Sequence, residues 1–157
     1  MTAEDRLAAL GISLPAPAAP VANYLPFVLS GPLLAVSGQL PIGPSGKLDP
    51  AHTGKLGVAV SSKAGHAAAR LCAINILAQA KAALGDLERI SRCIRLGGFI
   101  NAAPGFADLA GVMNGASDLM VEILGDKGRH ARATVGVAEL PLDSAVEIEA
   151  LFEIACT

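Results

Sequence analysis

The sequence of 157 residues has few aromatic side chains and no excess of positive charge. Trp is absent, Tyr occurs once, and aromatic residues make up 3% of the chain. The formal net charge is −2, and the sequence pI is near 5.9. Proteins that bind nucleic acid usually present a basic surface and, for single strands, aromatic stacking platforms. The composition therefore argues against nucleic acid as a partner.

Cysteine is also scarce, and its spacing excludes the common thiol motifs. The three cysteines, Cys72, Cys93 and Cys156, are odd in number and form no Cys-x-x-Cys pair. This pattern is typical of free, buried thiols in a reducing compartment. His52 and His66 lack the spacing of paired metal ligands. We therefore expect a cytoplasmic protein that needs no metal and no cofactor.

Residues 11–46 contain no charged side chain, but they do not have the composition of a membrane helix. Seven of them are proline, which breaks helices. The acidic residues at the start of the chain do not resemble a secretory leader either. Hydrophobic residues nevertheless make up 52% of the chain, and the mean hydropathy is +0.51. We expect part of this apolar surface to lie between the subunits of a homo-oligomer.

The periodicity of the chain predicts an α+β fold. Long helices are expected at residues 63–84 and 106–124, because apolar residues recur there at helical spacing. Strands are expected at 25–30, 33–37, 54–60 and 91–101, followed by two final strands within 130–154. The order is β-β-β-α-β-α-β-β. This order predicts one six-stranded mixed sheet with both helices packed on one face.

The first 20 residues are expected to form an extension before a single domain that spans residues 21–157. Thr2 and Asp5 have the spacing of a capping box, which predicts a short helix at residues 3–10. Residues 12–23 are rich in Pro and Ala, which favours an extended tether between this helix and the domain.

The last two strands hold the most informative polar residues. Alternation places Arg132 and Thr134 on one face of the first strand, and Glu147, Glu149 and Glu153 on one face of the second. A short turn between the strands predicts a hairpin, so the arginine and the glutamates would lie on adjacent strands. The sequence does not determine their register. One interpretation is a cross-strand ion pair that only stabilises the sheet, and the other is a binding site.

The same residues resemble a known family. Arg132-Ala-Thr-Val-Gly-Val-Ala-Glu-Leu-Pro, followed by Val146-Glu-Ile-Glu-Ala, resembles the C-terminal signature of the Rid/YjgF family of reactive-intermediate (enamine/imine) deaminases, whose older label is endoribonuclease L-PSP. Ser37-Gly38-Gln39-Leu40-Pro41 resembles a second family element, and the resemblance covers residues 21–155. It implies a fold similar to that of trimeric chorismate mutase, a homotrimer, and small-molecule clefts between adjacent subunits.

The resemblance also implies a role for each matching residue. The family's counterpart of Arg132 binds a substrate carboxylate, and the counterpart of Glu147 holds the hydrolytic water. At position 134, a threonine replaces the cysteine that is common in the best-studied branch, so a thiol takes no part. The substrate-binding positions implied in this way are Tyr24, Gly38, Thr134 and Asn114.

These observations predict the hydrolysis of small 2-imino or enamine acids to 2-oxo acids and ammonia. An arginine binds a carboxylate with two parallel hydrogen bonds, and a protonated imine needs little more than an oriented water. The alternative is a trimer that binds 2-oxo acids without catalysis or acts like a chaperone. The net charge disfavours an endoribonuclease or translation inhibitor. His130 either carries protons at the mouth of the cleft or is a solvent-exposed loop residue.

Overall fold

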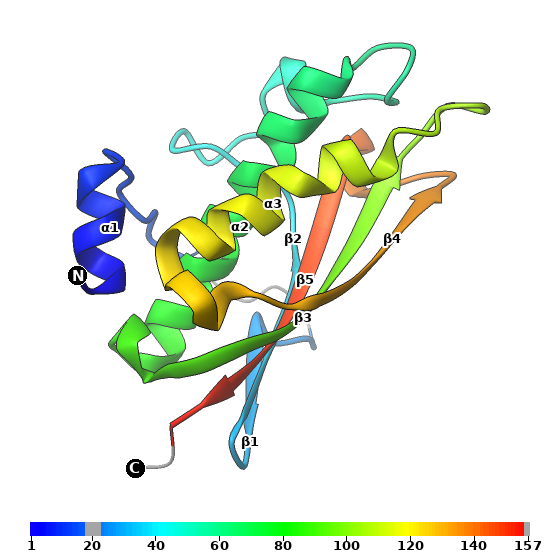
Figure 1. Ribbon diagram of the computed structural model, residues 1–157. Coiled ribbons are helices and arrows are strands. Elements are labelled where there is room, and N and C mark those ends of the chain that lie inside the picture. The colour runs from blue at the N-terminus through cyan, green and yellow to red at the C-terminus, as the bar shows by residue number, and fades with distance from the viewer. Residues whose placement is uncertain (18–22, 156–157) are drawn as a thin grey trace.

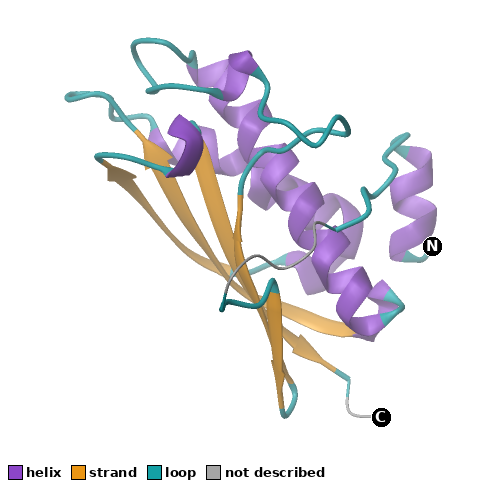
Figure 2. Ribbon diagram, turned by 180° about the vertical axis from the view of Figure 1, so that it is seen from behind, coloured by secondary structure: helices purple, strands orange, loops and turns teal. Residues whose placement is uncertain are grey.

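Two long helices cover one face of a single sheet, and the other face is open (Figure 1, Figure 2). The computed structural model describes residues 1–17 and 23–155. Its helices are α1 (Ala3–Ala9), α2 (Ser62–Leu84) and α3 (Leu109–Leu124). Its strands are β1 (Phe27–Ser30), β2 (Leu33–Gln39), β3 (Ile90–Asn101), β4 (Ala131–Val137) and β5 (Val146–Ile154). The predicted α+β class, with both long helices on one face, is confirmed.

The strands lie in the order β1-β2-β5-β3-β4. β3 and β4 are parallel, because α3 crosses over the sheet between them, and the other pairs are antiparallel. The sheet is therefore mixed, as predicted, and its edges are β1 and β4. It has five strands among the described residues, and the prediction of six is wrong.

The missing strand is the one expected at residues 54–60. Gly54 and Gly57 have φ angles of 103° and 88°, which other residues rarely adopt, and the chain turns at both. Leu56 between them is fully buried. Its backbone N–H donates to the carbonyl of Asn101, and its carbonyl accepts from the N–H of Ala103. The apolar residues of this segment therefore anchor a loop to the end of β3.

The hairpin expected for the last two strands is also wrong, because β3 lies between β4 and β5. The connecting segment crosses the end of β3, where the buried side chain of Asn101 holds it. The Asn101 amide donates to Asp143 Oδ1 at 3.0 Å and accepts from Lys55 Nζ at 2.7 Å. Leu142 and Asp143 have φ angles of 58° and 54° and turn the chain into β5. Alternation predicted both strands, but it carries no information on their partners.

Small residues set the spacing between α2 and α3. Ala69, Cys72 and Ala73 of α2 are fully buried in the core. Gly115 of α3 lies against the backbone of His66 in α2, and a Cβ built on it would be 2.0 Å from the His66 carbonyl oxygen. By length and composition α2 could also span a membrane, but 61% of its most apolar window is buried inside the protein, as in a core helix.

The N-terminal helix begins as the sequence predicts and packs on the same core. Thr2 caps α1 by accepting from the N–H of Asp5 at 3.1 Å, and the Asp5 carboxylate accepts from the N–H of Thr2 at 2.8 Å. Leu7 is buried in the core. Arg6 donates to the carbonyl of Ile123, at the end of α3, at 3.1 Å.

The described cysteines are buried, as expected. Cys72 and Cys93 are fully buried and form no disulfide. Burial raises the pKa of the Cys93 thiol to about 12, so this thiol stays protonated at neutral pH. Cys156, like part of the proline-rich segment 12–23, lies outside the described residues.

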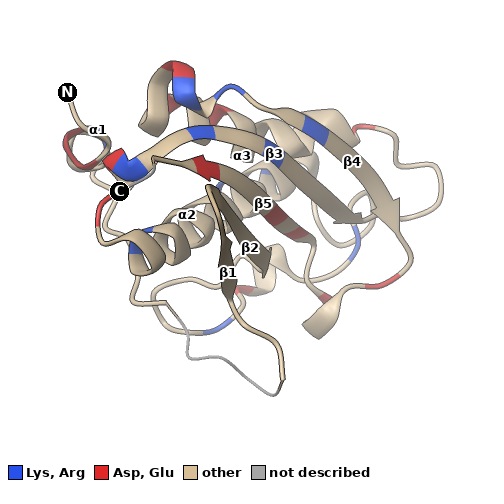
Figure 3. Cartoon of the chain, turned by 90° about the horizontal axis from the view of Figure 1, so that it is seen from below, with Lys and Arg blue, Asp and Glu red and all other residues tan. Residues whose placement is uncertain are grey.

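The open face of the sheet combines exposed apolar side chains with charged ones, and Figure 3 shows the charged positions on β3 and β5. Val28 of β1, Leu33 of β2 and Val135 of β4 belong to rows that point away from the helices, and they are 49%, 38% and 47% exposed. The charged residues of this face are Glu147, Glu149, Glu153, Arg92 and Arg95. Exposed apolar side chains gathered on one face are typical of a surface that contacts another protein.

Candidate functional site

Arg132 extends from the edge strand β4 toward α3. Its Nη1 donates to Ser117 Oγ at 3.0 Å, and its Nη2 donates to the carbonyl of Ala110 at 3.5 Å. Its neighbour in the β3–β4 register is Leu96, which is fully buried beneath the helices. Arg132 therefore lies on the helix-covered side of the sheet, exposed at its edge. None of the ion pairs among the described residues includes it.

Ser117 links Arg132 to His130 through a chain of hydrogen bonds. His130 Nδ1 lies 2.6 Å from the carbonyl oxygen of Gly128, and Nε2 lies 2.9 Å from Ser117 Oγ. Because a carbonyl oxygen only accepts, Nδ1 donates to Gly128, and Nε2 shares a hydrogen bond with the Ser117 hydroxyl. Ser117 Oγ in turn accepts from Arg132. This chain holds the guanidinium in place and leaves other N–H groups for an anion.

Two more of the predicted residues lie beside Arg132. Thr134 follows it on the same face of β4, and Thr134 Oγ1 is buried without a hydrogen-bond partner among the described residues. Asn114 is exposed on α3, four residues after Ala110 and three before Ser117. Residues at these spacings share a helix face, so Asn114 lies in the row that Arg132 contacts. The arginine half-site, as we call it, consists of Arg132, Thr134, Asn114, Ser117 and His130.

Glu147 lies on the open face of the sheet, against the backbone of Gly38 in β2. A Cβ built on Gly38 would be 2.1 Å from Glu147 Oε1 and 2.9 Å from Glu147 Cδ, so the missing side chain leaves the space for the carboxylate. Burial, and to a smaller extent the charge of Glu149, raise the pKa of the Glu147 carboxyl above its ordinary value of 4.5. A carboxyl with a raised pKa is better suited to accept and return a proton near neutral pH.

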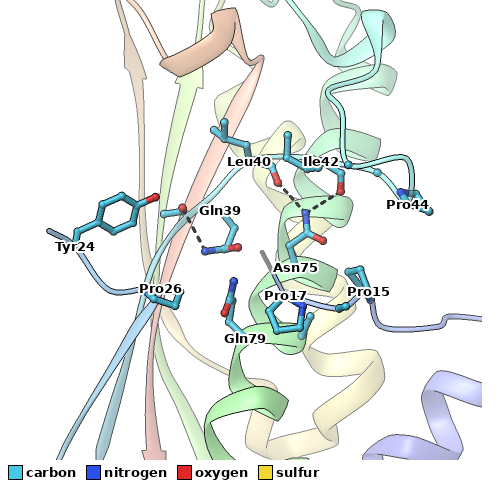
Figure 4. Close-up of a pocket in the computed structure, with 15 residues that line it drawn as sticks. Pro15, Pro17, Tyr24, Pro26, Gln39, Leu40, Ile42, Pro44, Asn75 and Gln79 are labelled. Atoms are coloured by element: carbon cyan, nitrogen blue, oxygen red, sulfur yellow. Dashed lines mark hydrogen bonds between the residues drawn. The ribbon is translucent and has the colours of Figure 1, made fainter. Parts of the chain in front are cut away.

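Tyr24 and Gly38 border one cavity of about 490 Å³. Tyr24 is 60% exposed, and its hydroxyl end points toward Gln39, the residue after Gly38 (Figure 4). The glutamate half-site, as we call it, consists of Glu147, Gly38 and Tyr24.

The two half-sites lie on opposite faces of the sheet and do not meet within one chain. Leu96, beside Arg132, faces the helices, whereas Phe99, beside Glu147, belongs to the row that faces away from them. Because β3 lies between β4 and β5, the prediction that the arginine and the glutamates lie on adjacent strands is wrong, and the opposite faces also exclude the cross-strand ion pair. Alternation divides each strand into two faces, but it does not tell which faces of two strands coincide.

Sequence reasoning missed Ser117, whose only signal is its position three residues after Asn114. It also left open whether His130 is an isolated loop residue, and the structure places His130 one hydrogen bond from Ser117. No group of three or more His, Cys, Asp or Glu side chains in the described part of the chain is placed to hold a metal ion.

Comparison with known proteins gives matches over nearly the whole chain. The family described as "YjgF/chorismate mutase-like, putative endoribonuclease" matches residues 4–154, which include all of α1 except its first residue. Protein TCP17 of Trypanosoma cruzi is 48% identical over an alignment of 159 residues. The alignment covers 98% of this chain and 98% of that protein. The crystal structure of Atu1372, a protein of unknown function from Agrobacterium tumefaciens, is 52% identical with a TM-score of 0.90, and the match covers 98% of this chain and 92% of that chain.

Two less similar crystal structures have more informative names. Escherichia coli TdcF with bound serine is 26% identical, with a TM-score of 0.63 over 91% of this chain and 96% of that chain. RidA from an Antarctic Psychrobacter is 29% identical, with a TM-score of 0.61 over 90% of this chain and 96% of that chain. The chain is thus similar to these proteins in fold and closer in detail to Atu1372.

Proposed function

The chain belongs to the YjgF/chorismate mutase-like family, and on this premise we propose that it hydrolyses small 2-imino or enamine acids to 2-oxo acids and ammonia. The observation that carries the proposal is the division of the site into an arginine half-site on one side of the sheet and a glutamate half-site on the other. A cytoplasmic homotrimer, in which the arginine half-site of one copy lies beside the glutamate half-site of the next, completes the site.

The surface of the sheet supports this assembly. Five of the seven residues of β4 are exposed, and Ala131 and Ala133 leave its edge open to close approach. An unpaired edge strand presents free backbone donors and acceptors to a partner. The open face of the next copy offers the exposed apolar residues Val28, Leu33 and Val135. A contact between two unlike surfaces of identical chains closes into a ring when the rotation allows it, as in a trimer.

The two half-sites supply complementary parts of the reaction. The guanidinium of Arg132 binds the substrate carboxylate with parallel hydrogen bonds. Glu147 of the neighbouring copy orients a water and takes a proton from it as the oxygen bonds to the imine carbon. The same carboxyl gives this proton to the imine nitrogen, which yields a carbinolamine with one hydroxyl and one amino group. The carboxylate then takes the hydroxyl proton and passes it to the amino nitrogen, the C–N bond breaks, and ammonia leaves as the carbonyl of the 2-oxo acid forms. Positioning and proton transfer account for the acceleration in this scheme.

The ligand of one relative and the name of another support the proposed substrate class. The TdcF structure contains serine, whose carboxylate and neighbouring nitrogen are also the polar groups of a 2-imino acid. RidA bears the name of the reactive-intermediate deaminases. Glu147 and Arg132 provide one partner for each of these polar groups, because the guanidinium suits the carboxylate and the carboxyl serves the nitrogen and the attacking water.

Ammonia release from an imine that an amino-acid oxidase generates in the assay tests this proposal. We expect Arg132→Ala and Glu147→Gln each to reduce the enzymatic rate roughly 100-fold or more, because each removes positioning that the reaction needs. Arg129→Ala is the matched control, since Arg129 is exposed and its one ion pair among the described residues is with Asp126 at 3.4 Å. An Arg132→Ala protein with the wild-type rate would refute the proposal.

The same assay separates the alternative functions. Binding of a 2-oxo acid that depends on Arg132, with no imine hydrolysed faster than in buffer, would identify a binding protein without catalysis. Cleavage of RNA, which the family description names, finds little support in a net charge of −2 and an open face that carries three glutamates.

A further inference from the structure

The cavity that Tyr24 and Gly38 of the glutamate half-site border is also lined by a group of side-chain amides. The cavity of about 490 Å³ lies between the end of β2, the loop that follows it, the middle of α2 and the segment at Pro15–Pro17 (Figure 4). Neither Arg132 nor Glu147 lines it, and none of its lining residues is charged. Its polar side chains are Gln39, Asn75, Gln79 and Tyr24, and we call it the amide pocket.

Two of these amides are oriented by the backbone around them. Both N–H groups of Asn75 donate to carbonyl oxygens, of Leu40 at 2.9 Å and of Ile42 at 3.0 Å. The amide nitrogen of Gln39 is directed to the carbonyl of Ser37 at 3.0 Å. Because the nitrogen atoms are engaged, Asn75 and Gln39 present their carbonyl oxygens as acceptors to the pocket.

The third amide, Gln79, is buried and unsatisfied. It is 4% exposed, and its Oε1 has no hydrogen-bond partner among the described residues. Gln79 lies four residues after Asn75 on α2, so both side chains leave the same helix face. Figure 4 shows the Gln79 amide pointing into the pocket toward Gln39. A buried amide without partners is unfavourable unless a ligand or water supplies them.

We propose that the amide pocket binds a neutral small molecule that carries a carboxamide group. A carboxamide offers N–H donors to the carbonyl oxygens of Gln39 and Asn75, and a carbonyl that accepts from the Gln79 amide nitrogen or the Tyr24 hydroxyl. Carbon atoms of the ligand contact the prolines that border the pocket. A carboxylate would face acceptor oxygens without a cation, and an ammonium group would be buried without an acidic partner. The pocket therefore selects against both charged analogues.

Nuclear magnetic resonance of the full-length, ¹⁵N-labelled protein tests the proposal with isobutyramide and its isosteric acid, isobutyrate. We expect isobutyramide to shift the side-chain amide signals of Gln79, Asn75 and Gln39 in a saturable titration, and isobutyrate to leave them unchanged. We expect Gln79→Met to weaken binding by about fivefold or more, since it removes the hydrogen bonds but keeps the shape. Lys63→Met, at an exposed position of the same helix, is the control and is expected to bind as the wild type does.

Equal binding of isobutyrate, absence of any saturable shift, or unchanged affinity of a folded Gln79→Met protein would overturn the proposal. If Gln79→Met does not fold, Gln39→Met, at a less buried position at the end of β2, decides in the same way. The pocket shares Tyr24 and Gly38 with the glutamate half-site, but Arg132 and Glu147 lie outside it, so amide binding does not require imine hydrolysis. Loss of activity in the Arg132→Ala protein would leave the amide titration unchanged.

Discussion

Replacing Gly38 by alanine tests the role of the space that Glu147 occupies. A Cβ at this position would lie 2.1 Å from Glu147 Oε1, 2.9 Å from Cδ and 3.1 Å from Cγ. Gly38 is not among the residues with positive φ, so alanine introduces no backbone strain. The whole effect of the substitution therefore falls on the Glu147 carboxylate, which has to leave its present position.

The size of this effect follows from the same distances. The contact between Cβ and Oε1 must lengthen from 2.1 Å to the 3.4 Å of an ordinary contact. A misplacement of about 1 Å at a reacting group costs roughly 100-fold in rate. The side chain itself is flexible, and a shift away from its preferred rotamer costs about 1 kcal/mol. We therefore expect a large loss of imine hydrolysis with a small loss of stability.

The rate of imine hydrolysis and the stability in urea, measured for four proteins, distinguish displacement of the Glu147 carboxylate from a general loss of structure. The proteins are the wild type, Gly38→Ala, Glu147→Ala and the double variant. In the Glu147→Ala background the obstructing atoms are gone, so Gly38→Ala is expected to change neither rate nor stability. Gly43→Ala is the control, because nothing lies within 4 Å of its Cβ. Wild-type activity of Gly38→Ala, or an equal loss of stability in both backgrounds, would refute the reasoning.

Three further predictions concern packing, charge and orientation. Gly115→Ala is expected to cost about 2 to 3 kcal/mol in urea unfolding, because its Cβ would meet the His66 carbonyl, which is backbone and cannot rotate away. The Glu147 carboxyl has a higher pKa in the folded protein than in the unfolded chain, so it binds its proton more tightly when folded. The protonated carboxyl therefore stabilises the folded protein below pH 4.5, and this stabilisation is lost as the pH rises through the raised pKa. The stability of Glu147→Gln relative to the wild type should therefore increase between pH 4 and pH 7, and a constant difference would contradict this. Ser117→Ala removes a hydrogen bond to Arg132 and is expected to raise the KM for the imine about fivefold with little change in kcat.

The elements with local signals were predictable from the sequence. The capping box of Thr2 and Asp5, and the apolar periodicity of α2, depend only on residues close in the chain, and both are confirmed. The second long helix begins at Leu109 and not near Phe106, because Asp108 caps it by accepting from the N–H of Gly111 at 3.2 Å. Helix ends depend on such single hydrogen bonds, which periodicity does not reveal.

Strand partners and the composition of the site could not be predicted in the same way. The order of β4, β3 and β5 depends on the crossover of α3 and on Asn101, which holds the connecting segment across the end of β3. Alternation singled out Arg132 and Glu147, but their opposite faces follow from this order. Ser117 and Gln79 acquire their surroundings only when α3 and α2 pack on the sheet, and no local pattern marks them.

Complementation between two inactive variants tests most directly whether neighbouring copies share the site. Arg132→Ala and Glu147→Gln proteins are unfolded together, refolded as an equal mixture, and assayed for ammonia release. In a ring of randomly mixed subunits, about a quarter of the sites pair an intact Arg132 with an intact Glu147. The account therefore predicts recovery of about a quarter of the wild-type activity. A mixture as inactive as its components, although the refolded subunits have exchanged, would contradict it.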